Sequence, residues 1–340
     1  MEKLSFDLIK MNNLDVLRAI AILAVFAHHL AHVYHFQVPF FHQHGGWFGV
    51  QLFFLLSGYL IIQSADKYSP RNYFIHRILR IFPAYLIFYI MLGWFGGVLS
   101  FQKILEQPID FVLNLVLLQH FSPIATTSFN VLNVTWTLTI EICWYVCAIL
   151  LVKPIKRFPT TALLSSIGIS TLWTYLATHH QLDWIFQSPN DEQRYLFLNN
   201  AFPAQVVFFV MGAYIYFKQD WLMKQNPFLL ALMGVIILSS WFEAVHLLTN
   251  PNFISGIGLS AIVIMALQAP TLYVPFLKWI ADISYSIYLL HFSLLLYTYH
   301  HLNWKNPSSI FGAIALILLI TTLSYYAIEK PAMRLARRLT

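Results

Sequence analysis

Long apolar segments recur along this chain, and they restrict its fold more than any other feature. Each is about 20 residues long, the length at which an α-helix crosses the hydrocarbon core of a bilayer. Ten such segments are expected, at 14–36, 47–64, 81–100, 134–152, 160–177, 200–217, 227–247, 254–271, 280–299 and 309–328. The sequence therefore predicts an all-α fold: a polytopic integral membrane bundle of about ten transmembrane helices.

The composition points the same way. Only 10% of the 340 residues are charged, whereas a soluble domain carries about 25%. We therefore expect residues 1–340 to form a single transmembrane domain, with no soluble domain. The first apolar run exceeds a signal-peptide core and lacks a small-residue cleavage site, so it should remain as the first helix. Cys143 and Cys147 share one apolar run at helical spacing, which favours packing over a disulfide.

Lysine and arginine are distributed unevenly between the two sides of the predicted bundle. If the N-terminus is cytoplasmic, only three of the 20 fall on the outer side, namely Lys103, Arg194 and Lys305. Because positive residues gather in cytoplasmic loops, both termini are predicted to be cytoplasmic. The net charge of +6 is then explained by topology, and no nucleic-acid partner is expected.

Two outer segments are longer than the other connections. Residues 101–133 contain the apolar stretch "FVLNLVLLQH", which is too short for a span and is either re-entrant or interfacial. Residues 178–199 carry acids, histidines and aromatics, so sugar rings of an acceptor could stack on Trp184 or Tyr195. The plainer interpretation of this second segment is a solvated connector.

Ionisable residues inside the apolar segments are the strongest sign of function, because they are costly in lipid and face an interior or a cavity. Arg18 and His29 are eleven residues apart, so they share one helical face about 16 Å apart along the axis. Glu141 and His291 lie at the same depth as His29 in their own helices. A carboxylate beside a histidine would fix its tautomer. The plainer alternative is interhelical hydrogen bonding that only packs the bundle.

The inner side offers a complementary cluster. Arg77 and Arg80 share a helical face in "RNYFIHRILRIFPAY", and paired arginines suit a polyphosphate ligand. Ordinary positive-inside charge is the alternative. Ser57 precedes Gly58 in mid-span, which predicts close helix packing or a hydrogen-bond donor into a cavity. The histidine-rich stretches at 28–44 lack nearby carboxylates and cysteines, so no metal site is expected.

Six segments in order resemble the acyltransferase-3 family of membrane-bound acyltransferases. They are "LRAIAILAVFAHH", "GVQLFFLLSGYLI", "RILRIFPAY", "TWTLTIEICWY", "ISYSIYLLH" and "IEKPA". The resemblance covers nearly the whole chain. It implies an enzyme of the bacterial cytoplasmic (inner) membrane that moves an acyl group, commonly acetyl, from acyl-CoA to a hydroxyl of a surface polysaccharide or other glycan. Acyl-CoA would be a co-substrate, and no tightly bound cofactor is implied.

The resemblance also assigns residues. It implies His29 and Glu141 as catalytic residues, with the donor bound by three arginines: Arg18, Arg77 and Arg80. Four further residues would line the substrate pocket: Ser57, Trp136, Tyr288 and His291. Gln51 departs from the family, many of whose members carry an acid there. No extracytoplasmic hydrolase-like domain is expected, so either the membrane core completes transfer or a separate partner does.

His29 has two roles open to it, as a general base on the acceptor hydroxyl or as a nucleophile that forms an acyl-imidazole. Glu141 would orient it. Other protein classes remain as rivals. A proton-coupled secondary transporter also uses intramembrane histidines and acids, but it predicts paired repeats or helices broken by Gly or Pro in corresponding halves, and neither is seen in the sequence. A structural scaffold or sensor is the third alternative.

Overall fold

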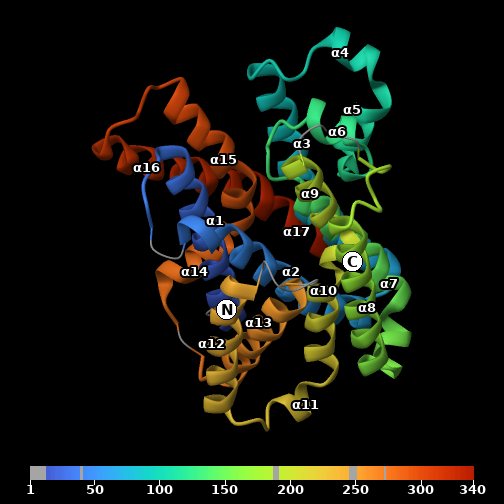
Figure 1. Cartoon of the computed structure of the whole chain (residues 1–340). Helices are drawn as coiled ribbons and strands as arrows, with labels where there is room; N and C mark the ends of the chain where they lie inside the picture. The colour runs from blue at the N-terminus through green and yellow to red at the C-terminus, as the bar shows by residue number, and fades with distance from the viewer. Residues whose placement is uncertain (1–12, 39–40, 187–190, 245–250, 272) are drawn as a thin grey trace, which may run out of the picture.

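A computed structural model describes residues 13–38, 41–186, 191–244, 251–271 and 273–340, and these form helices and connections without a β-strand (Figure 1). The all-α prediction is confirmed. The α-helices are α1 (Asn13–Tyr34), α2 (Phe41–Lys67), α3 (Pro70–Phe95), α4 (Phe101–Glu106), α5 (Pro108–Leu115), α6 (Pro123–Ser128), α7 (Trp136–Arg157), α8 (Pro159–Thr178), α9 (Asp191–Asn199), α10 (Phe202–Phe217), α11 (Gln219–Leu222), α12 (Pro227–Ala244), α13 (Pro251–Gln268), α14 (Pro275–Asp282), α15 (Ser284–His300), α16 (Pro307–Ser324) and α17 (Lys330–Leu339).

Six helical segments of the described chain are long and apolar enough to cross a bilayer. They are Asn13–Tyr34, Gly45–Lys67, Pro70–Phe95, Trp136–Arg157, Phe197–Phe217 and Pro307–Leu339. The bent pair α14 and α15 would make a seventh. A multi-pass membrane protein follows from these segments. A helix lies in each of the ten predicted ranges, but the count of ten spans and the side of each terminus stay predictions.

The third helix begins earlier than the apolar pattern predicts, at Pro70 rather than residue 81. The cause is local. The Ser69 side chain accepts a hydrogen bond from the Asn72 backbone N–H, and proline suits the first helical position. The basic stretch is therefore part of α3, and Arg77 and Arg80 are presented on one continuous helix.

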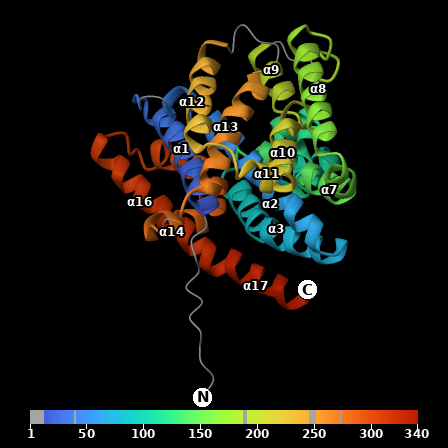
Figure 2. The same cartoon turned by 90° about the horizontal axis from the view of Figure 1, so that it is seen from below.

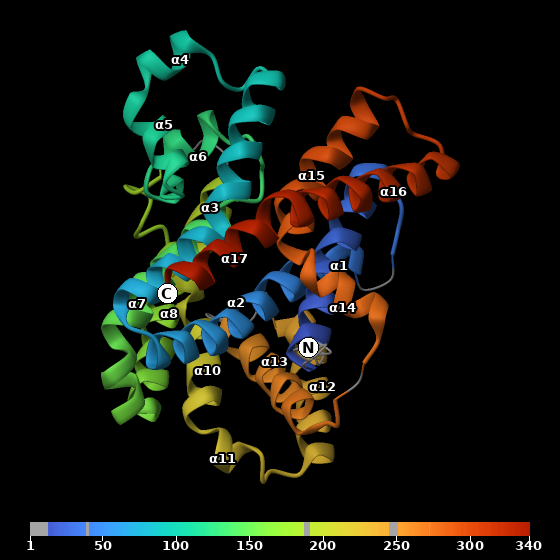
Figure 3. The same cartoon turned by 180° about the vertical axis from the view of Figure 1, so that it is seen from behind.

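Two glycines bring α2 and α10 into close contact at the centre of the molecule. A Cβ atom on Gly58 would lie 2.2 Å from the Phe209 carbonyl oxygen, and one on Gly212 would lie 2.1 Å from the Leu55 oxygen. The predicted close packing at Gly58 is confirmed. On its other side α2 packs against α1, and α15 packs against α1 in turn (Figures 1 and 3).

Residues 101–133 form short elements that project together at one end of the molecule (Figure 1): α4, α5, a 3-10 turn at Gln119–Phe121 and α6. Asn114 joins them, because its Nδ2 donates to the carbonyl oxygens of Asp110 and Ala125, both at 2.9 Å. The longest of these helices has eight residues. As expected from the sequence, this segment is too short to span a bilayer.

The C-terminal segment crosses the molecule as one extended rod. A π-helical turn at Tyr325–Glu329 joins α16 to α17. Figure 3 shows the rod crossing the near face of the bundle so that α17 lies along α3, and Figure 2 shows the same segment from below. Two contacts hold the end of α17 to α3: Asn72 Nδ2 donates to the Thr340 carbonyl at 3.5 Å, and the Thr340 hydroxyl lies 3.1 Å from His76 Nε2.

Candidate active site

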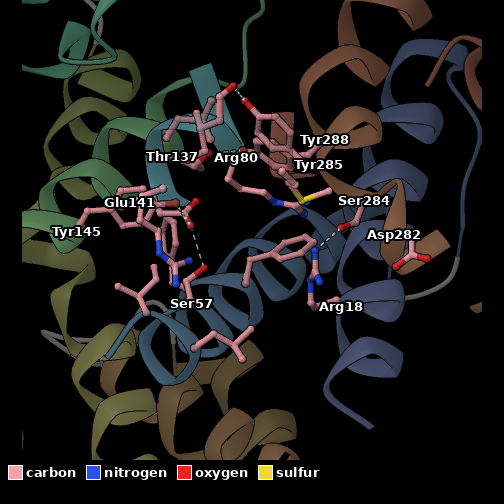
Figure 4. Close-up of a pocket in the computed structure, with 18 of the residues that line it drawn as sticks. Arg18, Ser57, Arg80, Thr137, Glu141, Tyr145, Asp282, Ser284, Tyr285 and Tyr288 are labelled. Atoms are coloured by element: carbon pink, nitrogen blue, oxygen red, sulfur yellow. Dashed lines mark hydrogen bonds between the residues drawn. The ribbon is translucent and has the colours of Figure 1, made fainter. Parts of the chain in front are cut away.

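A cavity of about 360 Å³ opens between α1, α2, α3, α7, α15 and α17 (Figure 4). Its charged lining consists of Arg18, Arg77, Arg80, Arg337, Glu141 and Asp282. Four cations against two acids give the cavity an excess of positive charge. Arginine binds phosphate and carboxylate oxygens through paired N–H groups, so such a lining suits an anionic ligand.

Arg18 is fixed by a bend between α14 and α15. The two helices meet at 71°, and the bend places Ser284 at the start of α15. The Arg18 guanidinium donates to the Ser284 hydroxyl at 3.0 Å and lies 3.5 Å from Asp15 (Figure 4). Lys278 also reaches Asp15, at 3.6 Å. This charged cluster holds Arg18 at the cavity wall.

Aromatic rings hold Arg77. Its guanidinium carbon lies 5.6 Å from the ring centroids of both Tyr73 and Tyr145. The Tyr73 hydroxyl donates to the Tyr145 carbonyl at 3.0 Å, which ties α3 to α7. The Nε atom of Arg77 is buried and has no hydrogen-bond partner within the described part of the chain. Arg77 is therefore held by cation–π contacts and retains a donor for a ligand.

Arg80 is held by residues of the C-terminal segment that the sequence interpretation did not single out. Its Nη1 lies 2.9 Å from the Met333 sulfur and 3.9 Å from Glu329 Oε2. Glu329 is only 1% exposed, and it accepts a hydrogen bond from Ser286. A buried carboxylate facing an arginine fixes both side chains. The signal was an acid at the end of an apolar run, in "AIEKPA".

Glu141 also belongs to the cavity. It accepts hydrogen bonds from Tyr145 at 3.0 Å and Ser57 at 3.3 Å (Figure 4), and it interacts electrostatically with Arg77 and Arg80. Among the described residues, no hydrogen bond or ion pair joins Glu141 to His29, so the expected orienting role of Glu141 has no contact to support it here.

His29 instead contacts His291. Nδ1 of His29 lies 2.9 Å from Nε2 of His291, and the ring centroids are 4.9 Å apart. His291 is fully buried, and Phe292 packs against His29 at 4.7 Å. The two histidines are thus in direct contact, although they are 262 positions apart in the chain.

The backbone around this histidine pair assigns its protons. Nδ1 of His291 lies 2.9 Å from the carbonyl oxygens of Ile287 and Tyr288, and a carbonyl only accepts, so this nitrogen carries the proton. In the neutral ring Nε2 of His291 is then an acceptor. Nδ1 of His29 lies 3.1 Å from the Val25 carbonyl and must therefore donate. The lone pair of His29 is left on Nε2, the arrangement that a base or nucleophile needs.

Tyr288 connects the histidine pair to the cavity. Its side chain lines the cavity, and its ring centroid lies 6.1 Å from that of His291. Its hydroxyl donates to the Val134 carbonyl at 3.0 Å and lies 2.6 Å from the Thr137 hydroxyl (Figure 4). His29 and His291 are not part of the cavity lining. The pair therefore lies one side chain beyond the cavity wall.

Of the predicted pocket residues, Ser57 and Tyr288 line the cavity, His291 lies behind it, and Trp136 is elsewhere. The Trp136 ring packs edge-on against Phe54, with centroids 6.2 Å apart. The polar residues of α7 that line the cavity are Thr137, Glu141 and Tyr145. These three residues are spaced i, i+4, i+8 and therefore share one helical face. Trp136 is turned about 140° away from Glu141, so the sequence could already have placed Trp136 off the cavity face.

Other residues noted in the sequence have plain surroundings. Gln51 is buried and accepts a hydrogen bond from Ser255 at 2.8 Å. Cys143 and Cys147 are free thiols. Trp184 is 75% exposed, whereas the side chain at position 195 lies outside the described residues. Among the described side chains, which leave out positions 42 and 44, no group of three His, Cys, Asp or Glu residues could hold a metal ion.

Comparison with known proteins gives a consistent result. Residues 11–329 match the family model described as an acyltransferase domain, of the acyltransferase-3 type. A Staphylococcus aureus (strain MSSA476) protein provisionally named an O-acetyltransferase is 25% identical over 362 residues, which cover 94% of this chain and 57% of the relative. Nodulation protein 10 of Rhizobium leguminosarum bv. viciae is 25% identical over 371 residues, which cover 97% of this chain and 96% of the relative. The chain spans little more than half the length of the staphylococcal relatives it matches. No solved structure matches the chain.

Proposed function

This chain belongs to the acyltransferase-3 family, and on that premise we propose that it is a membrane-bound O-acyltransferase. It takes an acyl group, in the simplest case acetyl, from acyl-CoA on the cytoplasmic face. The acceptor is a hydroxyl group of a glycan on the opposite side of the bacterial cytoplasmic membrane. The membrane core either completes transfer itself or hands the acyl group to a separate partner.

The arginine-lined cavity is the observation that carries the donor assignment. Coenzyme A is a polyanion with a pyrophosphate and a ribose phosphate, and four arginines line this cavity. A volume of about 360 Å³ is near the lower end of the range for small-molecule pockets, about 300–1,000 Å³. It suits the narrow pantetheine arm, while the nucleotide stays at the mouth among the arginines.

His29 supplies the chemistry in this proposal, through the lone pair on Nε2. As a base it takes the proton of the acceptor hydroxyl while that oxygen forms a bond to the thioester carbonyl carbon. The carbon–sulfur bond then breaks, and the sulfur of CoA receives the proton back from His29. As a nucleophile, Nε2 attacks the thioester carbonyl carbon, and the carbon–sulfur bond breaks to release the CoA thiolate and leave the acyl group on the imidazole. The acceptor hydroxyl then attacks the acyl carbon, the carbon–nitrogen bond breaks, and the hydroxyl proton passes to the CoA thiolate. In both routes the hydrogen bond to His291 keeps the tautomer fixed.

Tyr288 must move for the thioester to meet His29, since its ring lines the cavity and packs 6.1 Å from the ring of His291, which lies outside the lining. Ser57 and Glu141 lie on the cavity side of this barrier and contact the donor rather than the acceptor. The role of Glu141 in the proposal is to balance Arg77 and Arg80 when no donor is bound, which keeps the guanidinium groups in place.

The test uses purified protein in nanodiscs, radiolabelled acetyl-CoA and added glycan extract, with CoA release and label transfer as readouts. We expect His29→Ala and His291→Ala to abolish both. The matched controls are His32→Ala and His300→Ala. Each removes an exposed histidine from the same helix as its test variant, α1 for His29 and α15 for His291. Label retained on wild-type protein selects the acyl-imidazole route.

Two results would overturn the proposal. Equal activity of the His29→Ala and His32→Ala variants would remove His29 from the chemistry. If the wild type neither binds nor turns over any member of a panel of acyl-CoAs in the presence of membrane extract, the donor assignment fails. Proton-coupled transport then becomes the leading interpretation of the intramembrane histidines.

A further inference from the structure

The helix α17 forms one wall of the cavity, a role that its position at the end of the chain does not suggest. Met333 and Arg337 of this helix line the cavity, whereas Arg334 and Arg338 do not. α16 has 18 residues and is about 27 Å long at 1.5 Å per residue. It nearly spans the hydrocarbon core by itself, so α17 continues the helix beyond the length that a bilayer core requires.

α17 is held in place by α3 along its length. Met333 contacts Arg80 near its start, and Thr340 contacts Asn72 and His76 at its end. Arg337 lies between these two anchors. Its guanidinium is therefore brought to the cavity by a fixed helix.

Arg337 differs from Arg18 and Arg80 in exposure and in charge pairing, and from Arg77 in exposure. The Arg18 and Arg80 side chains are 23% and 24% exposed, and they face Asp15 and Glu329. The Arg337 side chain is exposed and also lines the cavity, so it lies at the cavity mouth. No carboxylate forms an ion pair with it among residues 13–38, 41–186, 191–244, 251–271 and 273–340.

We propose that Arg337 is a specificity-determining residue that binds the ribose phosphate of the coenzyme A nucleotide. This inference rests on the proposed function. When the pantetheine arm points inward, the deeper arginines meet the pyrophosphate, and the outermost cation meets the phosphate that is farthest from the thioester. The C-terminal helix thus distinguishes CoA from donors that share its arm and pyrophosphate but lack the ribose phosphate.

The experiment compares acetyl-CoA with acetyl-3′-dephospho-CoA as donors for the wild type, Arg337→Gln and Arg338→Gln in nanodiscs. A charge-assisted contact corresponds to about a tenfold or larger change in KM. We expect wild type and Arg338→Gln to have a KM for acetyl-CoA about tenfold below that for the dephospho donor. Arg337→Gln should raise the KM for acetyl-CoA to the dephospho value, leave the dephospho KM unchanged and leave kcat unchanged. Arg337→Lys should restore part of the preference.

Each alternative outcome has a distinct meaning. If the wild type uses both donors equally, or if Arg337→Gln raises both KM values by the same factor, the phosphate assignment is overturned while the proposed function stands. If Arg337→Gln behaves as Arg338→Gln with both donors, the assignment is likewise wrong. If the wild type uses neither acetyl donor, the same comparison is made with the acyl chain that the acyl-CoA panel selects. If it uses no acyl-CoA of that panel, the proposed function and this inference fail together. Size-exclusion profiles and thermal unfolding confirm that each variant is folded.

Discussion

The contact between α2 and α10 makes a sharp prediction about stability. We expect Gly58→Ala and Gly212→Ala each to destabilise the protein, because the helices touch through backbone atoms at these positions. The new Cβ atoms would lie 2.2 Å and 2.1 Å from carbonyl oxygens, whereas real Cβ contacts keep at least 3.0 Å. The helices would have to separate by about 0.8 Å, and overpacking of this kind costs about 1–3 kcal/mol.

Gly168 in α8 provides a matched control. Nothing lies within 4 Å of the position its Cβ would take. Gly168→Ala should therefore be neutral or stabilising by up to about 1 kcal/mol, because alanine is the better helix former. The same glycine-to-alanine change, in three helices of one bundle, is thus predicted to have opposite signs.

The assay is thermal unfolding in a mild detergent, followed by tryptophan fluorescence and by the recovery of monodisperse protein. Gly58→Ala carries a second expectation. Ser57 lines the cavity beside it, so a displaced α2 should also raise the KM for the donor. Unfolding temperatures of Gly58→Ala and Gly212→Ala equal to that of Gly168→Ala would refute the close approach of α2 and α10.

Two further predictions concern buried ionisable groups. Glu329→Gln removes the charge that faces Arg80 and should raise the KM for the donor several-fold with little loss of kcat. Glu106→Gln on exposed α4 is the control and should change neither value. Equal kinetics of the two variants would count against a positioning role for Glu329. His120, outside the membrane-spanning helices, is buried with Nε2 at 2.8 Å from the Phe197 carbonyl, and burial lowers its pKa to about 4. The unfolded chain, with a pKa near 6.5, takes up this proton first on acidification, so the wild type should lose up to about 3 kcal/mol between pH 7 and pH 4. His120→Gln keeps a donor for Phe197 and should lose less in unfolding scans across that range; parallel pH profiles would contradict the assignment.

Much of the helical framework was predictable because a bilayer leaves the backbone no alternative hydrogen-bond partner, so apolar length alone dictates a helix. A helix lies in every range predicted from apolar length. The error at the start of α3 has a local reason: hydropathy marks where lipid begins, whereas the helix begins at its Ser-Pro cap. The facial pairing of Arg77 and Arg80 was equally accessible, since it depends only on the helical repeat.

Contacts between side chains on different helices could not be predicted from the sequence and became visible only in the tertiary structure. Sequence gives the depth of a residue in the membrane, but depth does not fix the direction in which a helix turns its side chains or which helices become neighbours. The sequence predicts one depth for Glu141 and His29. In the structure, Glu141 accepts hydrogen bonds from Tyr145 and Ser57, whereas His29 contacts His291.

Apolar length and composition were therefore enough to predict a multi-pass membrane bundle of helices with ionisable side chains inside its apolar segments. The tertiary structure decided which of these residues form a site. The bend between α14 and α15, the close approach at Gly58 and the return of α17 to α3 set the relative rotations of the helices. Those rotations depend on packing among residues hundreds of positions apart, and no local pattern in the chain encodes them.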